Sequence, residues 1–222
     1  MTGTAPPITA FSPAERQVIR RCSTPARVQS FLNRLPYNTE SDGETVRSFR
    51  QVVRRRTVHC LEAALSAACI LEQHGYPLLL LDLHSADNLD HILFVYRTRG
   101  GWGSVARSRD PGLHGRKPVF RSLRALAMSY YDEYIDFTGR LTAFATFDLR
   151  RLGDYDLRLA ERNMWHVHRT LIGQRGAIKL KGAPGRARQL RIAYKKYMAE
   201  YGKKPIYYEG RDKWTPIPKS FL

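Results

Sequence analysis

Cysteine is scarce in this chain, and its scarcity argues against two classes of protein. Among 222 residues the only cysteines are Cys22, Cys60 and Cys69. An odd number without regular spacing does not fit a small secreted protein held together by disulfides. No two of them form a Cys-x-x-Cys pair, so the spacing gives no indication of a structural zinc site. The sequence therefore favours a reducing compartment, in which each thiol stays free.

Long apolar runs are missing as well. No uninterrupted apolar stretch reaches the length of about eighteen residues that a membrane-spanning helix needs. The opening segment, Met1–Pro7, lacks the basic-then-apolar pattern of a secretory signal. We therefore expect a cytoplasmic protein without a membrane span. A glycine-rich phosphate loop and a metal-ligand motif are also missing, so we expect no cofactor.

Acidic residues are few relative to basic ones. The chain has 37 Lys and Arg against 20 Asp and Glu, a formal charge of +17, and residues 169–222 alone carry +11. Such an excess attracts polyanions. We therefore predict contact with a nucleic acid or an acidic protein through a basic C-terminal region. Its expected helix, Arg186–Tyr201, carries Leu190 and Tyr194 on one face, so a docked helix with a solvated basic face remains the alternative.

Helix-start signals dominate the N-terminal part. Ser12 and Glu15 form a capping-box pattern, and Thr24 followed by Pro25 repeats the N-cap signal. A third, basic helix is expected over residues 46–56. The N-terminal part is therefore expected to be mostly helical.

The clearest helix is Cys60–His74, which is apolar around most of its circumference and is expected to be buried. Gly75 and Pro77 end it. Another helix is expected over residues 122–136. Period-two or continuous apolar patterns indicate strands at 76–83, 91–98, 102–109 and 142–149.

These elements predict an α+β fold, with N-terminal helices and a central buried, Cys-bearing helix packed on an antiparallel sheet. We expect a flexible tail over residues 1–10 and a catalytic core over 11–153. A basic helical extension is expected over 154–222.

The order of helix, strand and hairpin suggests a nucleophile. Cys60 opens a helix, where unpaired N–H groups and the helix dipole stabilise a thiolate. His91 opens a strand expected to pack near that helix, so its imidazole is a candidate base. His59 has three possible roles: assisting Cys60, binding an anion, or standing as a partly exposed neighbour. For the oxyanion, the Cys60 N–H and the Gln51 side chain are the candidate donors.

The hairpin supplies a candidate for the third member of a triad. If Gly100 and Gly101 form a two-residue turn, His91 lies opposite Asp110 on one face of the sheet. A carboxylate there would hold the imidazole in the correct tautomer. Ser108 and Asp90 are the alternatives.

Two segments carry a family resemblance. Residues 57–77, with a cysteine that opens an alanine-rich helix ending near Gly-x-Pro, and residues 90–96, followed by a Gly-Gly-Trp hairpin, resemble the transglutaminase-like superfamily. The resemblance spans roughly residues 45–115. It implies a papain-like core and cysteine-dependent acyl-transferase or hydrolase activity on an amide- or acyl-bearing substrate, with Cys60 and His91 as the carried-over residues.

The sequence departs from that family pattern at two positions. His59 stands where a small residue usually precedes the cysteine, and Asp110 comes later than the family's aspartate. The charge of +11 over residues 169–222 supports an alternative function, a non-enzymatic basic binding protein on a degenerate transglutaminase-like fold.

Overall fold

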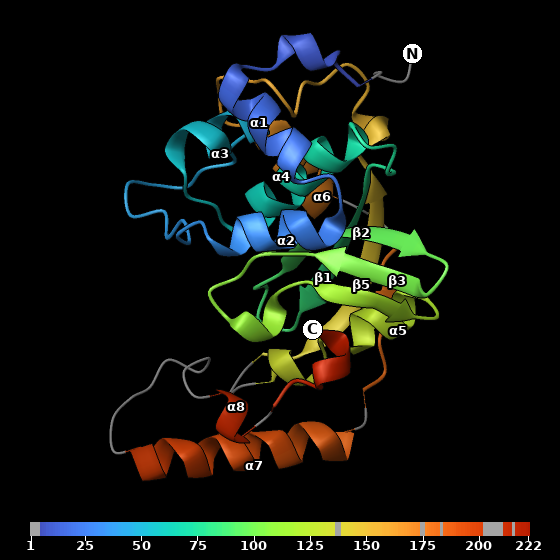
Figure 1. The fold of residues 1–222 in the computed structure, drawn as a ribbon. Helices are drawn as coiled ribbons and strands as arrows, with labels where there is room; N and C mark the ends of the chain where they lie inside the picture. Colours follow the sequence, from blue (N-terminus) through green and yellow to red (C-terminus); the bar gives the residue numbers. More distant parts are fainter. Residues whose placement is uncertain (1–4, 136–138, 174–175, 183, 202–210, 215) are drawn as a thin grey trace.

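A six-stranded antiparallel sheet with helices on both faces forms the framework of the protein (Figure 1). The computed structural model describes residues 5–135, 139–173, 176–182, 184–201, 211–214 and 216–222. The predicted α+β class is confirmed. In spatial order β4-β3-β2-β1-β5-β6, the strands comprise β1 (Leu79–Ser85), β2 (His91–Thr98), β3 (Gly101–Val105), β4 (Arg116–Phe120), β5 (Leu141–Asp148) and β6 (Ile178–Lys179).

The helices form two groups separated by the sheet. One group covers the upper face in Figure 1 and comprises α1 (Pro13–Arg21), α2 (Pro25–Asn33), α3 (Phe49–Arg55), α4 (Cys60–Glu72) and α6 (Trp165–Ile172). The other lies below the sheet and comprises α5 (Leu123–Met128), α7 (Pro184–Tyr201) and α8 (Arg211–Trp214). Short 3-10 turns are η1 (Ile8–Ala10), η2 (Pro111–Leu113), η3 (Asp132–Tyr134), η4 (Leu149–Leu152) and η5 (Lys219–Phe221). The sheet therefore separates two hydrophobic cores.

The predicted capping signals begin the helices as expected. Ser12 and Glu15 form the capping box of α1, and the Thr24 hydroxyl accepts a hydrogen bond from Arg27 N–H at the start of α2. The third helix is shorter than predicted. It begins only at Phe49, because Ser48 caps it.

Helix α4 is the centre of the first core. All residues from Leu61 to Leu71 are buried. They include four alanines with no exposed surface, and these small side chains let strand β2 pack close to the helix. After the helix, Gly75 adopts a φ of 81°, the left-handed conformation expected of a residue that ends a helix.

The β2–β3 hairpin has a different register from the one predicted. Thr98 pairs with Gly101 and Arg97 with Trp102, so the turn is Arg99-Gly100 and the predicted pairing is wrong by two residues. Gly101 is needed inside the strand, because its φ is 133° and a Cβ there would lie 2.6 Å from the backbone of the neighbouring strand β4.

The C-terminal part contacts both cores. Val167 and Leu171 of α6 belong to the first core, whereas Leu180 and Leu190 belong to the second. Strand β6 extends the sheet beside β5. Residues 154–222 are thus packed on the rest of the chain where the structure describes them.

Some of the sequence predictions concern residues that the structure does not describe. Residues 1–4 of the predicted tail lie outside the described residues. The remainder of the tail includes η1, and the carbonyl of Pro6 accepts a hydrogen bond from Gln73 at 2.9 Å. Tyr207 and Tyr208 of the basic C-terminal region also lie outside the described range. None of the described helices has the length and apolar character needed to cross a membrane.

Candidate active site

Cys60 lies at the first position of α4, as the sequence predicts. His59 is the N-cap, and its Nδ1 accepts a hydrogen bond from Leu61 N–H at 3.2 Å. The Glu62 carboxylate accepts one from the backbone N–H of His59 at 3.0 Å. The local geometry therefore holds the thiol at the positive end of the helix.

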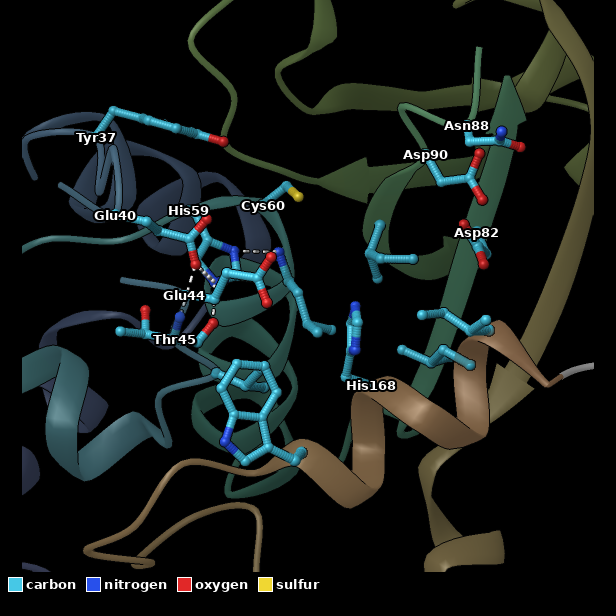
Figure 2. Close-up of a pocket in the computed structure, with 16 residues that line it drawn as sticks. Tyr37, Glu40, Glu44, Thr45, His59, Cys60, Asp82, Asn88, Asp90 and His168 are labelled. Carbon is cyan, nitrogen blue, oxygen red and sulfur yellow. Dashed lines mark hydrogen bonds and ion pairs between the residues drawn. The ribbon is translucent and has the colours of Figure 1, made fainter. Parts of the chain in front are cut away.

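A cavity of about 300 Å³ opens beside Cys60 (Figure 2). One wall comes from the segment between α2 and α3, with Tyr37 and Glu40, and another from Trp165 and His168 of α6. The end of the sheet supplies the far side. Cys60 is partly exposed, whereas Cys22 and Cys69 are buried. Cys60 is therefore the thiol that a ligand in this cavity would meet.

The surroundings of Cys60 favour its ionised form. Desolvation raises the pKa of the thiol, but hydrogen bonds from His59 and His91, with the charges of both rings, outweigh it and lower that pKa from 9.0 to about 5. For Cys22 and Cys69 burial raises the thiol pKa instead. Cys60 is thus the only one of the three with the electrostatics of a nucleophile.

The two histidines near Cys60 differ in which ring nitrogens are occupied. His59 Nε2 contacts the Thr45 carbonyl at 2.8 Å while its Nδ1 accepts from Leu61 N–H, so both nitrogens are engaged. His91 Nε2 contacts the Leu113 carbonyl at 2.8 Å. A carbonyl can only accept, so Nε2 carries the hydrogen and Nδ1 keeps its lone pair for the thiol proton. His91 is therefore the better base. His59 caps the helix, and although desolvation opposes it, the hydrogen bond and charge of Cys60 raise the pKa of His59 to about 9, so its protonated ring pairs with the thiolate.

His59 is also more enclosed than the sequence suggested. Only 9% of its surface is exposed, so the interpretation as a partly exposed neighbour is wrong. Its capping role and its contact with Thr45 account for the burial.

Asp110 does not contact His91 in the way the hairpin register predicted. Strand β3 ends at Val105, so its pairing with β2 stops before either residue. Asp110 instead caps the turn η2, where it accepts a hydrogen bond from Gly112 N–H at 2.7 Å. It also forms an ion pair of 2.9 Å with Arg211. Asp110 therefore supports the turn whose last carbonyl, that of Leu113, contacts His91.

The two alternative partners are also engaged away from the imidazole. The Ser108 hydroxyl accepts from Asp110 N–H at 3.1 Å. Asp90 accepts from Ser85 N–H at 2.8 Å through Oδ1. The described contact that orients the His91 ring is thus a backbone carbonyl.

Tyr37 is a site residue that the sequence analysis did not identify. Burial and the Cys60 charge raise the pKa of its hydroxyl, against the lowering effect of Arg109 and of the nearby Cys60 N–H, so the phenol stays protonated and can donate. The guanidinium groups of Arg107 and Arg109 lie 5.8 and 5.9 Å from its ring. By contrast, Gln51 is used elsewhere, because it caps α3 and donates to the Glu161 carbonyl at 2.7 Å.

Glu62 anchors the wall of the cavity to α4. Its side chain is fully buried, and besides His59 N–H it accepts hydrogen bonds from the Thr45 hydroxyl at 2.7 Å, Arg47 N–H at 3.1 Å and the Asn38 amide at 3.2 Å. A buried carboxylate with four donors is well compensated. The segment that carries Tyr37 and Thr45 is therefore tied to the helix that carries Cys60.

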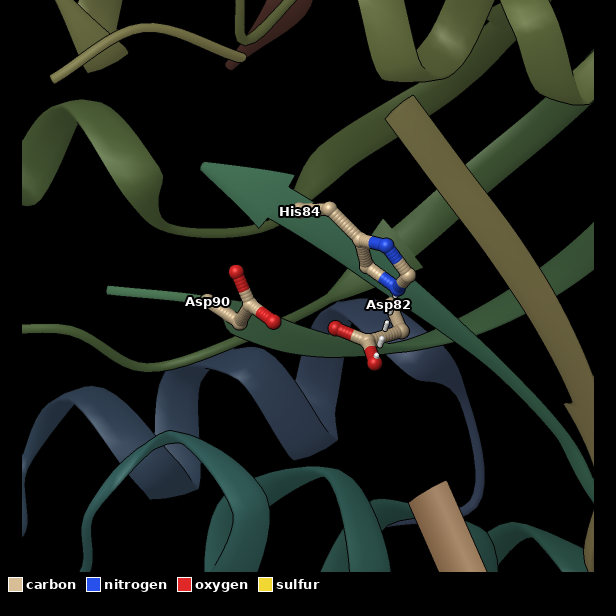
Figure 3. Close-up of side chains that lie close together, drawn as sticks. All are labelled: Asp82, His84 and Asp90. Atoms are coloured by element: carbon tan, nitrogen blue, oxygen red, sulfur yellow. Dashed lines mark ion pairs between the residues drawn. The ribbon is translucent and has the colours of Figure 1, made fainter. Parts of the chain in front are cut away.

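A second group of titratable side chains lies across the cavity from Tyr37. Asp82, His84 and Asp90 bring one carboxylate or imidazole atom each to within 4.8 Å of one another (Figure 3). Asp82 and Asp90 also line the cavity. Among the described residues this is the one such cluster with a metal-compatible spacing. No sequence motif pointed to it, since its members come from β1 and the turn before β2.

Comparison with known proteins adds no family assignment. No protein-family model matches the sequence, and a search of curated proteins gives no match either. The function must therefore be inferred from the geometry around Cys60.

Proposed function

We propose that this protein is a cysteine-dependent acyl transferase or hydrolase on a transglutaminase-like, papain-like core. The observation that carries the proposal is the Cys60 thiol, which opens onto a cavity and is hydrogen-bonded to buried His91, a base already oriented by the Leu113 carbonyl. The buried α4, which packs on β2, is the arrangement expected of that core.

The chemistry follows from the positions of these groups. The Cys60 sulfur attacks a carbonyl carbon to form a tetrahedral adduct, while His91 holds the thiol proton. Collapse of the adduct breaks the bond to the leaving group, which takes the proton from His91. The resulting thioester is then cleaved by water or by an acceptor nucleophile, which releases the thiol.

The developing oxyanion has two nearby donors. The backbone N–H of Cys60 is one, at the unpaired end of the helix. The Tyr37 hydroxyl lies near that N–H, so an oxyanion that takes the place of the hydroxyl as the acceptor would receive hydrogen bonds from both groups. Tyr37 takes the role that the sequence analysis gave to Gln51.

Asp110 is a positioning residue in this account. Its side-chain hydrogen bond and ion pair are with Gly112 and Arg211, and its interaction with the His91 ring is between charges, without a hydrogen bond. Its effect reaches His91 through the turn η2 and the Leu113 carbonyl.

A covalent acylation assay tests the proposal. The protein is mixed with p-nitrophenyl acetate, and one acetyl group per chain should accumulate on Cys60 as p-nitrophenolate is released. Mapping by mass spectrometry should leave Cys22 and Cys69 unmodified, because both are buried. Cys60→Ser should remove the modification. If N-acetylcysteine is acylated under the same conditions and Cys60 is not, the proposal fails.

Replacing the tyrosine should separate oxyanion stabilisation from thiol activation. Tyr37→Phe removes the hydroxyl but keeps the ring, so acylation of Cys60 should slow by about 10–100-fold. The pH at which Cys60 ionises should change little. An unchanged acylation rate would remove Tyr37 from the oxyanion site.

Polyanion binding remains a second, separate prediction. Helix α7 buries Leu190 and Tyr194 and exposes Arg188, Lys195 and Lys196, so it has the docked face and the basic face that its sequence indicated. An exposed basic face of this kind is equally compatible with binding to a nucleic acid, binding to an acidic protein, or a solvated surface without a partner. The thiol site is therefore the better supported of the two functions.

A further inference from the structure

The cavity beside Cys60 has the opposite charge from the rest of the protein. Glu40, Glu44, Asp82 and Asp90 line it, and no Lys or Arg is among its lining residues. The whole chain has 37 basic and 20 acidic residues. A locally acidic cavity in so basic a protein is a selective feature, because it favours a cation where most of the surface repels one.

Asp82 is the least compensated of these carboxylates. It is only 4% exposed, and its Oδ2 lies 3.3 Å from His84 Nε2. Its Oδ1 is buried and has no hydrogen-bond partner among the described residues. Burial raises the pKa of Asp82 to about 6, and Asp90 acts in the same direction although His84 opposes it. A buried carboxylate oxygen without a donor is costly unless a ligand supplies one.

Two further acceptors adjoin Asp82 on the far side of the cavity from Tyr37 (Figure 2). Asp90 accepts a hydrogen bond from Ser85 N–H through Oδ1. Its second oxygen can accept a hydrogen bond from a ligand. Asn88 lines the same end, and its side-chain amide has one oxygen that can accept a hydrogen bond. Oxygen atoms of Asp82 and Asp90 are close enough for one small cation to bridge them.

We propose that Asp82, Asp90 and Asn88 bind a primary ammonium group of the substrate whose carbonyl reacts with Cys60. The inference rests on the proposed function and adds a substrate class, namely acyl compounds with a positively charged amine. An ammonium has three N–H donors and no acceptor, which matches three oxygen acceptors. The substrate would lie across the cavity with its carbonyl at Tyr37 and Cys60 and its amine at Asp82.

A transition-metal ion suits this end of the cavity less well. His84, the nitrogen ligand that would favour a transition metal, contacts Asp82 rather than lining the cavity. The groups that do face the cavity there are two carboxylates and an amide.

The test uses two thiol reagents of opposite charge, 2-aminoethyl and 2-sulfonatoethyl methanethiosulfonate. In each case the Cys60 thiolate attacks the sulfur that carries the charged ethyl group. A mixed disulfide forms, and methanesulfinate leaves. The rate on the Cys60 peptide is followed at low salt by mass spectrometry. The ratio of cationic to anionic rates is divided by the same ratio for N-acetylcysteine. The thiolate fraction cancels in this ratio, so a change in the Cys60 pKa does not affect it.

The normalised ratio should be about 100 in the native protein, because attraction and repulsion each contribute roughly tenfold. Asp82→Asn should lower it by about tenfold, and adding Asp90→Asn should lower it further. Asp87→Asn is the matched control. Asp87 lies in the same turn as Asp90, accepts from Leu89 N–H and does not line the cavity, so the ratio should not change.

Three outcomes would overturn the inference. A normalised ratio near one in the native protein is the first, and a ratio that the double variant does not lower is the second. The third is loss of the cation preference on adding MnCl₂, with recovery in His84→Ala, which would assign the site to a metal. Each leaves the proposed function intact if acylation of Cys60 persists. Failure of acylation, in contrast, overturns the proposed function itself.

Discussion

Replacing His91 with alanine is expected to raise the pH midpoint for alkylation of Cys60 by about 2 units. In the native protein the midpoint should lie near 5, because that is where the thiol ionises. Reactivity should be present above the midpoint and lost as the pH falls through it. Without the His91 ring, the thiolate loses a hydrogen bond and a favourable charge, whereas the helix terminus and His59 remain.

The midpoint is the informative quantity, and a single rate near neutral pH is not. A thiolate of low pKa is intrinsically a weaker nucleophile, so its higher population and its lower reactivity partly cancel at pH 7. The measurement is therefore the rate of iodoacetamide labelling of the Cys60 peptide as a function of pH.

His168→Ala is the matched control for this variant. His168 lines the same cavity but is not among the largest causes of the shift in the Cys60 pKa. Its replacement should leave the midpoint in place. If His91→Ala and His168→Ala give the same profile as the native protein, His91 does not act on the thiol.

Replacing Glu62 with alanine should destabilise the fold by about 3–5 kcal/mol. The side chain is fully buried. Its removal leaves four buried or partly buried donors without their acceptor, namely those of Asn38, Thr45, Arg47 and the N–H of His59. Urea unfolding followed by circular dichroism measures the change in the free energy of unfolding.

Glu62→Gln tests which part of that effect is due to charge. The amide keeps the shape and one acceptor oxygen, so its cost should be smaller than that of alanine. Glu40→Gln serves as the control at a cavity carboxylate that is about one-third exposed. The amide keeps an acceptor for Thr45 N–H, so this change should cost under about 1 kcal/mol. A Glu62→Ala variant as stable as the native protein would show that the wall of the cavity does not depend on this carboxylate.

Local signals in the sequence were sufficient for much of the fold. Capping patterns at Ser12 and Thr24 correctly predicted where two helices start. Such a pattern is local, because the cap side chain bonds to a backbone N–H only three residues later. Strand β2 has the predicted bounds, and α4 begins at the predicted cysteine. The strand β4 was missed, since its segment contains Pro118 and resembles a loop; it lies at the edge of the sheet, where proline is tolerated.

The site was less predictable because its contacts span long distances in the sequence. Tyr37 reaches Cys60 from the segment after α2, and Arg211 reaches Asp110 from the last helix. Neither contact can be recognised from a pattern in the neighbouring sequence. Gly101 was misread as a turn residue because its actual constraint, the backbone of β4, lies outside the hairpin.

The most direct test of the account is an ultraviolet titration of the thiolate, with native protein measured against Cys60→Ser. The difference absorbance should rise with a midpoint near pH 5. A midpoint near 9, the ordinary value for a cysteine thiol, would contradict the proposal that Cys60 is an activated nucleophile.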